Sequence, residues 1–439
     1  MYLRAFSQLN IDFLTPNWLA IKMKNITILH CSETLSVSGC CRVMEHLAKN
    51  VDASRFTSVF CAGSGEPTYL DYLRQENIET HIVKNFLPKL QTPFVAILHR
   101  SGNSAPFWEK LIPLLREAGV SAIIERNIFG YPDKKLDRQL DSICANSMNT
   151  LWHHWRQSGK PDIAQYLMRH RVLYNAVSFA PTQSELSTLR SEWRQKLNIA
   201  EDAFVLGIIT RPDPQKIDAL ILGLIARLKK SIPNFTLITR HYPEILAKPL
   251  RLMLGNRYHN LPVSADPKML KATYALIDVC GNFPSIGESF GMAAAEAMRS
   301  YKPVIALDLP QKNKGNSLRE LIEHGVTGYL AQTPTEVAML LENLAKDRAL
   351  CEQMGAAAQQ KMTSAPFGLQ SIISQFEAEI LHQLGESFSV PMQPDKVMIR
   401  QYLETYPQRL DNAMLPTERH FSLPVTATRL VWKILRRCV

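Results

Sequence analysis

The segment GNFPSIGESFGMAAAEAMRSYKPVIAL, residues 281–307, carries two carboxylates eight residues apart, Glu288 and Glu296, and is the most informative part of the chain about function. The apolar residues 275–280 before it predict a short strand, and the residues rich in Gly, Pro and Ser predict a loop with Glu288 near its end. Strong helix formers from Met292 to Met298 predict a helix, and residues 301–310 predict a return to a buried strand. In a parallel sheet this order places the helix N-terminus at the carboxyl ends of the strands, where its N–H groups and dipole attract phosphate.

The two acids can share one pocket. Gly291 allows close approach of a ligand to the backbone, and Glu296 lies two turns after Glu288, so both side chains can point to the same side. We expect Glu288 at the mouth of the cleft and Glu296 deeper. By spacing alone, a solvated helix face is the more frequent explanation of such a pair.

The wider sequence context favours the pocket. The stretch E-S-F-G-M-A-A-A-E, followed by A-M-R-S-Y-K-P-V-I-A, resembles the signature of retaining glycosyltransferases with a GT-B fold, known as glycosyltransferase family 4 or glycosyl transferases group 1. Other segments of the chain also resemble this family: 26–51, 172–181, 206–238 and 320–347. The resemblance covers roughly residues 25–385. It implies an α/β protein of GT-B architecture, with two doubly wound Rossmann-like domains that face each other across a cleft.

The expected domain organisation follows from this resemblance and from composition. A chain of 439 residues with 46% hydrophobic content can bury two cores. We expect a linker around 178–192, which is polar and contains proline. The predicted divisions are an N-terminal extension (1–24), an acceptor-side domain (25–185), a nucleotide-sugar-binding domain (186–364), and a crossover helix with a basic amphipathic tail (365–439).

The resemblance also implies roles for individual residues. Arg211 and Lys216 would grip the diphosphate of a nucleotide-sugar donor, and Glu288 would contact the hydroxyls of the transferred sugar. The backbone N–H groups of Phe290, Gly291 and Met292 would face the phosphates, and Glu296 would accept hydrogen bonds from the ribose.

Some positions depart from the family pattern. The glycine-rich turn has Gly39 alone, followed by Cys40 and Cys41, so the approach of phosphate or acceptor to the backbone there is in question. Arg240 and His241 stand where the family often has a glycine pair. Where many members place a histidine near the reacting sugar, this chain has Arg126 and Asn127, and Asn127 is a candidate catalytic residue. His99, from the preceding strand end, faces the same cleft and could assist the acceptor or hydrogen-bond a loop.

The resemblance implies a retaining glycosyltransferase that moves a sugar from a nucleotide sugar to a saccharide or lipid-linked acceptor, in polysaccharide or glycolipid biosynthesis. No convincing Asp-x-Asp metal motif occurs, so we expect metal-independent transfer without a cofactor. The alternative is a non-catalytic GT-B scaffold or binding subunit of a glycosylation complex. A nucleotide-sugar epimerase on the same architecture fits the acidic motif less well. The sequence does not identify the donor base, sugar, acceptor, linkage or oligomeric state.

Charge and cysteine content bear on location. Eight cysteines without a C-x-x-C pair, and residues 1–24 without a secretory signal, predict small core thiols in a reducing cytoplasm. The net charge is +10, but the basic residues are dispersed and no nucleic-acid motif occurs, so we expect no nucleic-acid partner. The tail VTATRLVWKILRRCV, 425–439, has four basic residues and no acid. It predicts either an interfacial helix on the anionic inner face of the cytoplasmic membrane or a packed helix with solvated cations.

Overall fold

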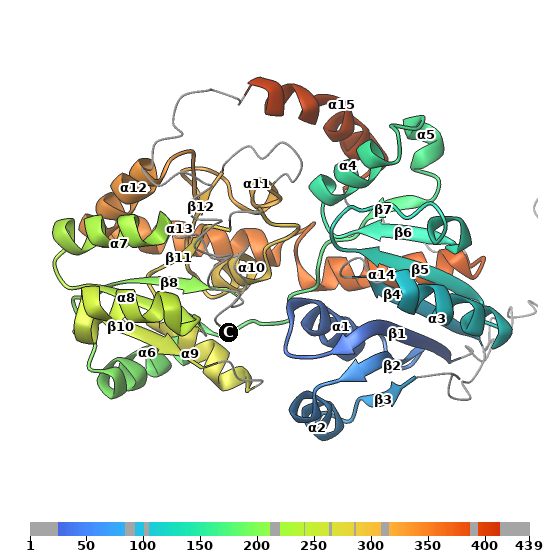
Figure 1. Cartoon of the computed structure of the whole chain (residues 1–439), viewed down its shortest axis with the longest axis horizontal. Coiled ribbons are helices and arrows are strands. Elements are labelled where there is room, and N and C mark those ends of the chain that lie inside the picture. The colour runs from blue at the N-terminus through green and yellow to red at the C-terminus, as the bar shows by residue number, and fades with distance from the viewer. Residues whose placement is uncertain are drawn as a thin grey trace, which may run out of the picture.

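The computed structural model describes residues 25–83, 93–100, 105–210, 220–240, 242–262, 266–284, 287–308, 316–386 and 394–412. Within these ranges the strands form two sheets, one of seven and one of six strands, and every strand pair is parallel. Figure 1 shows the two sheets in separate domains, the first on the right and the second on the left. The predicted GT-B architecture of two doubly wound α/β domains is therefore confirmed.

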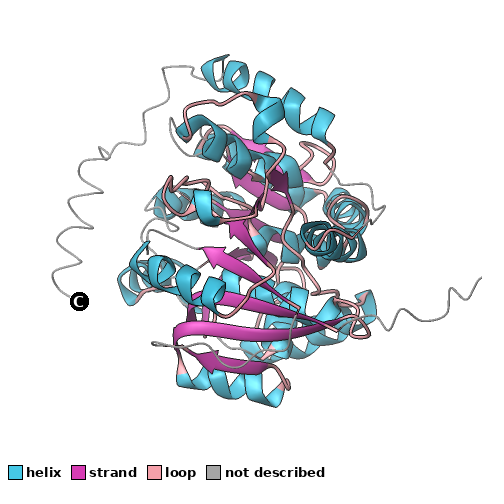
Figure 2. Cartoon of the chain, turned by 90° about the vertical axis from the view of Figure 1, so that its right-hand side faces the viewer, coloured by secondary structure: helices cyan, strands magenta, loops and turns pink. Residues whose placement is uncertain are grey.

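The first domain is built on a sheet of order β3-β2-β1-β4-β5-β6-β7. The strands β4 and β5 are buried almost throughout, as expected of parallel strands covered on both faces. Figure 2 shows helices on both faces of this sheet. The elements are β1 (Ile26–Leu35), α1 (Gly39–Asn50), β2 (Phe56–Gly65), α2 (Pro67–Gln75), β3 (Glu79–Ile82), β4 (Phe94–Arg100), α3 (Ala105–Glu117), β5 (Ala122–Asn127), β6 (Ser142–Ala145), α4 (Met148–Gln157), α5 (Ile163–Tyr166) and β7 (His170–Val172).

The second domain repeats this plan on a sheet of order β10-β9-β8-β11-β12-β13. In both sheets the strand order reverses beside the first strand, between β1 and β4 and between β8 and β11, which is where open α/β sheets bind ligands. The elements are α6 (Gln183–Leu197), β8 (Phe204–Ile209), α7 (Leu220–Ser231), β9 (Phe235–Arg240), α8 (Glu244–Leu254), β10 (Tyr258–Leu261), α9 (Pro267–Leu276), β11 (Val279–Asn282), α10 (Met292–Arg299), β12 (Val304–Leu307), α11 (Leu318–Leu321), β13 (Gly328–Ala331), α12 (Pro334–Lys346) and α13 (Arg348–Thr363).

The local predictions around the acidic motif hold in part. The predicted helix over 292–298 is α10, and the strand after it is β12. The strand predicted over 275–280 was misplaced: α9 continues to Leu276, and β11 begins at Val279. Helix α9 starts at Pro267 after an Asp266 cap, and its helix formers extend the helix into the apolar run.

The predicted linker over 178–192 is mostly helical. Thr182 and Glu185 form a reciprocal capping box that starts α6 within this segment. Arg190 of α6 then donates a hydrogen bond to Asp278, at 2.7 Å, between α9 and β11. Residues from Gln183 onward therefore pack with the second domain.

Two late helices lie against the first domain. In α14 (Leu369–Gln383), the Phe376 ring stacks on the His30 ring of β1, with centroids 6.1 Å apart. Glu377 accepts a hydrogen bond from the backbone N–H of Asp52 at 2.7 Å. The last helix, α15 (Lys396–Asn412), contacts α4 at the top of the first domain (Figure 1). The chain thus ends its described course on the domain where it began.

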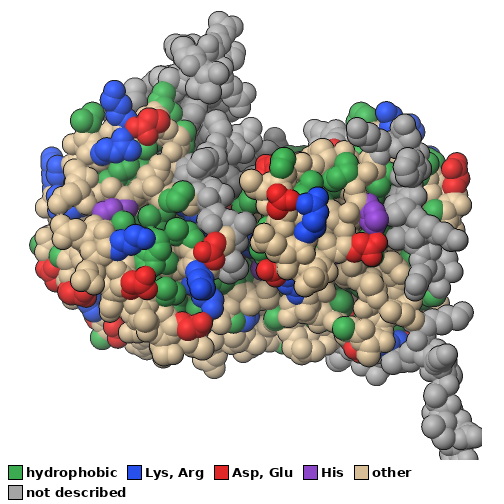
Figure 3. All heavy atoms as spheres, turned by 90° about the horizontal axis from the view of Figure 1, so that it is seen from below, with side chains coloured by type: hydrophobic (Ala, Val, Ile, Leu, Met, Phe, Trp, Pro, Cys, Tyr) green, Lys and Arg blue, Asp and Glu red, His purple; other side chains and the backbone are tan. Residues whose placement is uncertain are grey.

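The exposed face seen in Figure 3 carries basic and acidic side chains interspersed over both domains. This distribution agrees with the predicted dispersal of charge. All seven described cysteines are free, and six of them are buried, as predicted for small core residues. Across the described ranges, no helix has the length and apolar character needed to span a membrane. The predicted N-terminal extension and the basic tail 425–439 lie outside the described residues.

Candidate active site

A cleft of about 340 Å³ lies between the two domains. Its walls come from residues at or just after the carboxyl ends of strands in both sheets: His99 of β4 and Arg126 of β5 on one side, and Thr210 after β8 and Arg240 of β9 on the other. The first turn of α1 and the loop leading into α10 complete the walls. The cleft therefore lies where the strand order reverses in both sheets.

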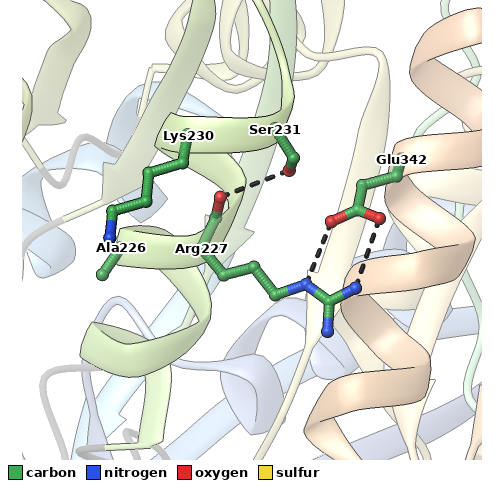
Figure 4. Close-up of a pocket in the computed structure, with 5 residues that line it drawn as sticks. All are labelled: Ala226, Arg227, Lys230, Ser231 and Glu342. Atoms are coloured by element: carbon green, nitrogen blue, oxygen red, sulfur yellow. Dashed lines mark hydrogen bonds and ion pairs between the residues drawn. The ribbon is translucent and has the colours of Figure 1, made fainter.

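A second hollow, of about 420 Å³, lies on the outside of the second domain between α7 and α12 (Figure 4). Arg227, which lines this hollow, donates from Nε and Nη2 to the two carboxylate oxygens of Glu342 at 3.0 and 3.3 Å. This hollow lies away from the strand ends and its described carboxylate is already paired. The cleft between the domains is therefore the better candidate for a functional site.

The start of α10 forms part of the cleft wall. Gly291 has a φ of +93°, and a Cβ at this position would lie 2.6 Å from Leu318 Cδ2, so only glycine fits without strain. The helix has no side-chain cap at its N-terminus. Phe290 is buried and its ring lies 6.2 Å from that of Tyr174. Phe290, Gly291 and Met292 all line the cleft, so the first N–H groups of α10 begin at its wall.

The two acids of the motif line the same cleft at different depths. Glu288 is half-buried in the loop, and its backbone carbonyl accepts hydrogen bonds from the Ser317 N–H and hydroxyl, both at 3.0 Å. Glu296 is buried. Its Oε1 accepts from Arg42 Nη1 at 2.7 Å, and its Oε2 accepts from the Tyr274 hydroxyl at 2.8 Å. Each carboxylate oxygen of Glu296 retains a second lone pair for a ligand hydroxyl.

His99 is buried in the cleft wall, with its Nε2 3.1 Å from Nδ1 of His30. Burial lowers the pKa of His99 well below its usual range, and repulsion between the two imidazoles if both were protonated, together with the charge of Arg126, acts in the same direction. Burial, with Arg126, also lowers the pKa of His30 to about 3. Both imidazoles are therefore neutral at neutral pH, and His99 can offer a hydrogen bond but no charge.

Asn127 and Gly39 occupy different surroundings. The Asn127 Oδ1 accepts from the Gly130 N–H at 2.7 Å, and its Nδ2 donates to the Tyr131 carbonyl at 3.3 Å. Asn127 thus holds the turn after β5 and is not among the residues that line the cleft. Gly39 is the first residue of α1 and does line it, opposite Met292: a Cβ on Gly39 would lie 3.6 Å from Met292 Cγ.

The sequence analysis assigns no binding or catalytic role to three arginines that line the cleft: Arg42 on α1, Arg126 on β5 and Arg240 on β9. Arg240 is buried, its Nε lies 3.4 Å from the Pro262 carbonyl oxygen, and burial lowers its pKa. The sequence could have indicated these three residues by their positions, because Arg126 and Arg240 end predicted strands and Arg42 lies in the first turn of a predicted helix. Together with Glu288 and Glu296 they give the described cleft one excess positive charge. The predicted diphosphate ligands Arg211 and Lys216 lie outside the described residues.

Hydrogen bonds across the cleft hold the loop that carries Glu288. The Ser289 carbonyl accepts from the Ser147 and Thr150 hydroxyls at 2.7 and 3.2 Å. Beside it, Glu320 of α11 accepts from the N–H groups of Met148 and Asn149 at 3.1 and 3.0 Å. Both contacts reach the N-terminus of α4 in the first domain. Burial raises the pKa of Glu320 to about 7, although these hydrogen bonds favour its ionised form.

Among the described residues, no three His, Cys, Asp or Glu side chains are grouped as metal ligands. The expectation of metal-independent chemistry remains a prediction.

Comparison with known proteins identifies the family. A model of the family described as glycosyl transferases group 1 matches residues 190–361, from α6 to α13. The second domain belongs to the glycosyl transferases group 1 family. The matched region of this group 1 domain includes Glu288, Glu296 and the whole of α10.

A curated relative is the lipopolysaccharide 1,2-N-acetylglucosaminetransferase of Salmonella typhimurium, 25% identical over 200 residues. The match covers 43% of this chain, and the chain spans 50% of the length of that relative.

Solved structures resemble the whole two-domain fold at low identity. Anabaena HepE in complex with UDP and glucose is 20% identical, with a TM-score of 0.64 over 81% of this chain and 99% of its own. A glycosyltransferase from Rickettsia africae is 14% identical, with a TM-score of 0.62 over 83% and 100%. WaaG, a glycosyltransferase involved in lipopolysaccharide biosynthesis, is 15% identical, with a TM-score of 0.51 over 80% and 99%. At these identities the likeness extends to the fold alone.

Proposed function

We propose that this chain is a retaining glycosyltransferase, which moves a sugar from a nucleotide-sugar donor to a saccharide or lipid-linked acceptor without a metal ion. One observation carries the proposal: the uncapped N-terminus of α10 and a set of arginines face one cleft at the carboxyl ends of both sheets. A departing nucleoside diphosphate needs positive charge that is already in place, and this wall supplies it.

The donor would lie along the second-domain wall. The N–H groups at Phe290, Gly291 and Met292 would bind the diphosphate, and Glu296, fixed by Arg42 and Tyr274, would accept hydrogen bonds from the ribose. Glu288, shallower in the cleft, would hold hydroxyls of the transferred sugar. Arg211 and Lys216 are proposed as further diphosphate ligands on the strength of the family resemblance.

The transfer would take place on one face of the sugar. The bond from the anomeric carbon to the diphosphate oxygen breaks, and the bond to the acceptor oxygen forms on the same side. The acceptor proton passes to the departing phosphate, so no protein nucleophile is required. This route is proposed because the resemblance is to retaining enzymes.

The names of the similar proteins support the substrate class. The Anabaena structure holds UDP and glucose, and the Salmonella relative and WaaG are lipopolysaccharide glycosyltransferases. We infer a nucleotide-sugar donor and an acceptor of an envelope or other surface polysaccharide. Such an acceptor would suit a protein at the inner face of the cytoplasmic membrane, attached through the basic tail 425–439.

Calorimetry with UDP, GDP and ADP tests nucleotide binding, and a donor panel read by mass spectrometry with and without acceptor tests transfer. We expect one diphosphate to bind saturably, and its sugar conjugate to be consumed faster with acceptor. NMR of the product should show the anomeric configuration of the donor. Saturable binding without transfer or hydrolysis would favour the scaffold alternative, which the single Gly39 and the missing histidine at 126–127 first suggested. No binding of any nucleotide or nucleotide sugar would contradict both.

A further inference from the structure

Arg126 is a buried cation for which the described chain supplies no counter-ion. Arg126 is 2% exposed and lines the wall of the cleft. Its Nη2 donates to the Asn175 Oδ1 at 2.9 Å and to the Tyr174 carbonyl at 3.3 Å, and both acceptors are neutral. Its Nη1 makes no hydrogen bond to any described residue. No described carboxylate forms an ion pair with it, in contrast to Arg42, which is paired with Glu296.

This arrangement costs stability. A buried charge without a counter-ion is unfavourable, because the charge has lost its hydration and gained no attraction in return. Burial lowers the pKa of Arg126 to about 10, so the guanidinium is still charged at neutral pH. The neighbouring His99 and His30 are neutral and cannot balance it. A group of this kind is expected where a ligand supplies the missing negative charge.

The surroundings of Arg126 are those of an oxyanion site. Neutral hydrogen-bonding side chains from neighbouring strand ends line the same wall: His99 from β4, Asn146 after β6 and Asn175 after β7. The N-terminus of α1, at Ser38 and Gly39, borders it as well. With both Nη2 protons donated to Asn175 and Tyr174, Nη1 carries two N–H donors that remain for an oxygen of a carboxylate or phosphate.

The diphosphate of the donor does not occupy this position in the proposed function. That diphosphate lies on the opposite, second-domain wall, beside α10. Arg126 belongs to the first-domain wall, on β5. Because the N–H groups of α10 hold the diphosphate in the proposed function, the anion assigned to Arg126 is a second negative group, carried by a sugar.

We propose that Arg126 is a specificity residue that binds an oxyanion, a carboxylate or phosphate monoester, on one of the two sugars in the cleft. The inference rests on the proposed glycosyl transfer and narrows its substrates to saccharides with an acidic group. That group is carried either by the transferred sugar, as in a hexuronic acid, or by the acceptor sugar.

Paired probes that differ only in charge test this assignment. Binding of glucuronate, glucose 6-phosphate and glucose is measured by NMR titration, alone and with a saturating nucleoside diphosphate. UDP-glucuronate and UDP-glucose are compared by calorimetry. The variants are R126Q, which removes the charge, and R126K, which keeps it. The matched control is R74Q on α2, where Arg74 is 72% exposed and pairs with Asp71.

We expect the wild type to prefer the charged member of a pair by about tenfold to a hundredfold, as for a charge-assisted hydrogen bond. R126Q should lose that preference, R126K should keep part of it, and R74Q should keep all of it. Preference within the nucleotide-linked pair assigns the anion to the donor. Preference only among the free sugars, in the presence of nucleoside diphosphate, assigns it to the acceptor.

Equal binding of charged and neutral probes to the wild type would overturn the proposal, and this measurement needs no variant. The proposal would also fail if R126Q weakened UDP binding tenfold with the sugar preference unchanged, because Arg126 would then serve the diphosphate. A melting temperature that falls in R126Q, with no wild-type preference, would identify a structural residue. If no nucleotide binds but the free acidic sugars are still preferred, the glycosyl-transfer proposal fails and the oxyanion site stands.

Discussion

Arg42 in the first domain and Glu296 in the second form an ion pair across the cleft, with Arg42 Nη1 and Glu296 Oε1 2.7 Å apart. The Glu296 side chain is 5% exposed and that of Arg42 is 22% exposed. The adjacent Glu296 carboxylate raises the pKa of the Arg42 guanidinium. The pair joins α1 to α10, and so it links the two domains at the proposed ribose position.

Replacing Glu296 by Gln should weaken both folding and nucleotide binding. Gln keeps the shape but removes the charge that balances Arg42. Urea unfolding of R42M, E296Q and the double variant should give a coupling energy of about 0.5–3 kcal/mol. Calorimetry should show weaker binding of the nucleoside diphosphate to E296Q. A coupling energy near zero would mean that the two side chains do not interact in solution.

Replacing Glu288 by Gln should reduce sugar transfer while the fold remains intact. Glu288 is half-buried in a loop, and the backbone carbonyls of Glu288 and Ser289 accept hydrogen bonds that hold this loop and that the substitution leaves in place. Loss of one charge-assisted hydrogen bond to the sugar should raise the activation free energy that governs kcat/KM by about 1.5–3 kcal/mol. The melting temperature should change little. The matched control is E117Q on the exposed end of α3, and wild-type kcat/KM in E288Q would place the site elsewhere.

The stability of the protein should depend on pH through Glu320. Its folded pKa of about 7 lies above the ordinary glutamate value of 4.5. A group with a raised folded pKa contributes most below its unfolded pKa, and this contribution is lost as the pH rises from about 4.5 through 7. We expect a loss of about 3 kcal/mol over that window.

Urea unfolding between pH 4.5 and 7.5 measures this effect. E320Q is neutral at all pH values and should lack that part of the slope, whereas E117Q, which changes an exposed glutamate, should keep it. Parallel curves for the wild type and E320Q would show that Glu320 does not titrate in this range.

Sugar transfer should persist in excess EDTA. Fixed cations and the α10 N-terminus can neutralise the departing phosphate, so no divalent ion is needed. The initial rate with the preferred donor should stay within about twofold of the untreated rate, a change of under 0.5 kcal/mol in the barrier. Activity that disappears with EDTA and returns with Mn²⁺ or Mg²⁺ would contradict this prediction.

Deletion of residues 425–439 should release the protein from anionic liposomes without weakening nucleotide binding. Four basic residues near an anionic surface contribute about 1 kcal/mol each, and added salt should weaken the attachment of the intact chain. Liposome sedimentation and calorimetry are the measurements. Unfolding on deletion would favour the packed helix instead.

The sequence by itself determined the fold class and the elements around the acidic motif. The helix α10 and the strand β12 follow from local periodicity and helix formers, which act over a few residues. The rule that ligands bind at the carboxyl ends of strands also predicts Glu288, Glu296 and His99 in one cleft, and all three line it. At 275–280 the apolar residues predict a strand, but the helix formers before them extend α9 to Leu276, so the predicted start of β11 was wrong.

Only the tertiary structure decided which polar groups meet. Arg42 and Glu296 are 254 residues apart in the chain, and no local pattern pairs them. Arg126 and Asn127 are neighbours in sequence, yet one lines the cleft and the other holds a turn, because successive side chains of a strand point to opposite faces. The charge of Arg126 is uncompensated because no described carboxylate, from any segment of the chain, forms an ion pair with it. Pairing and burial depend on contacts between distant segments, and those contacts exist only when both domains are folded and packed together.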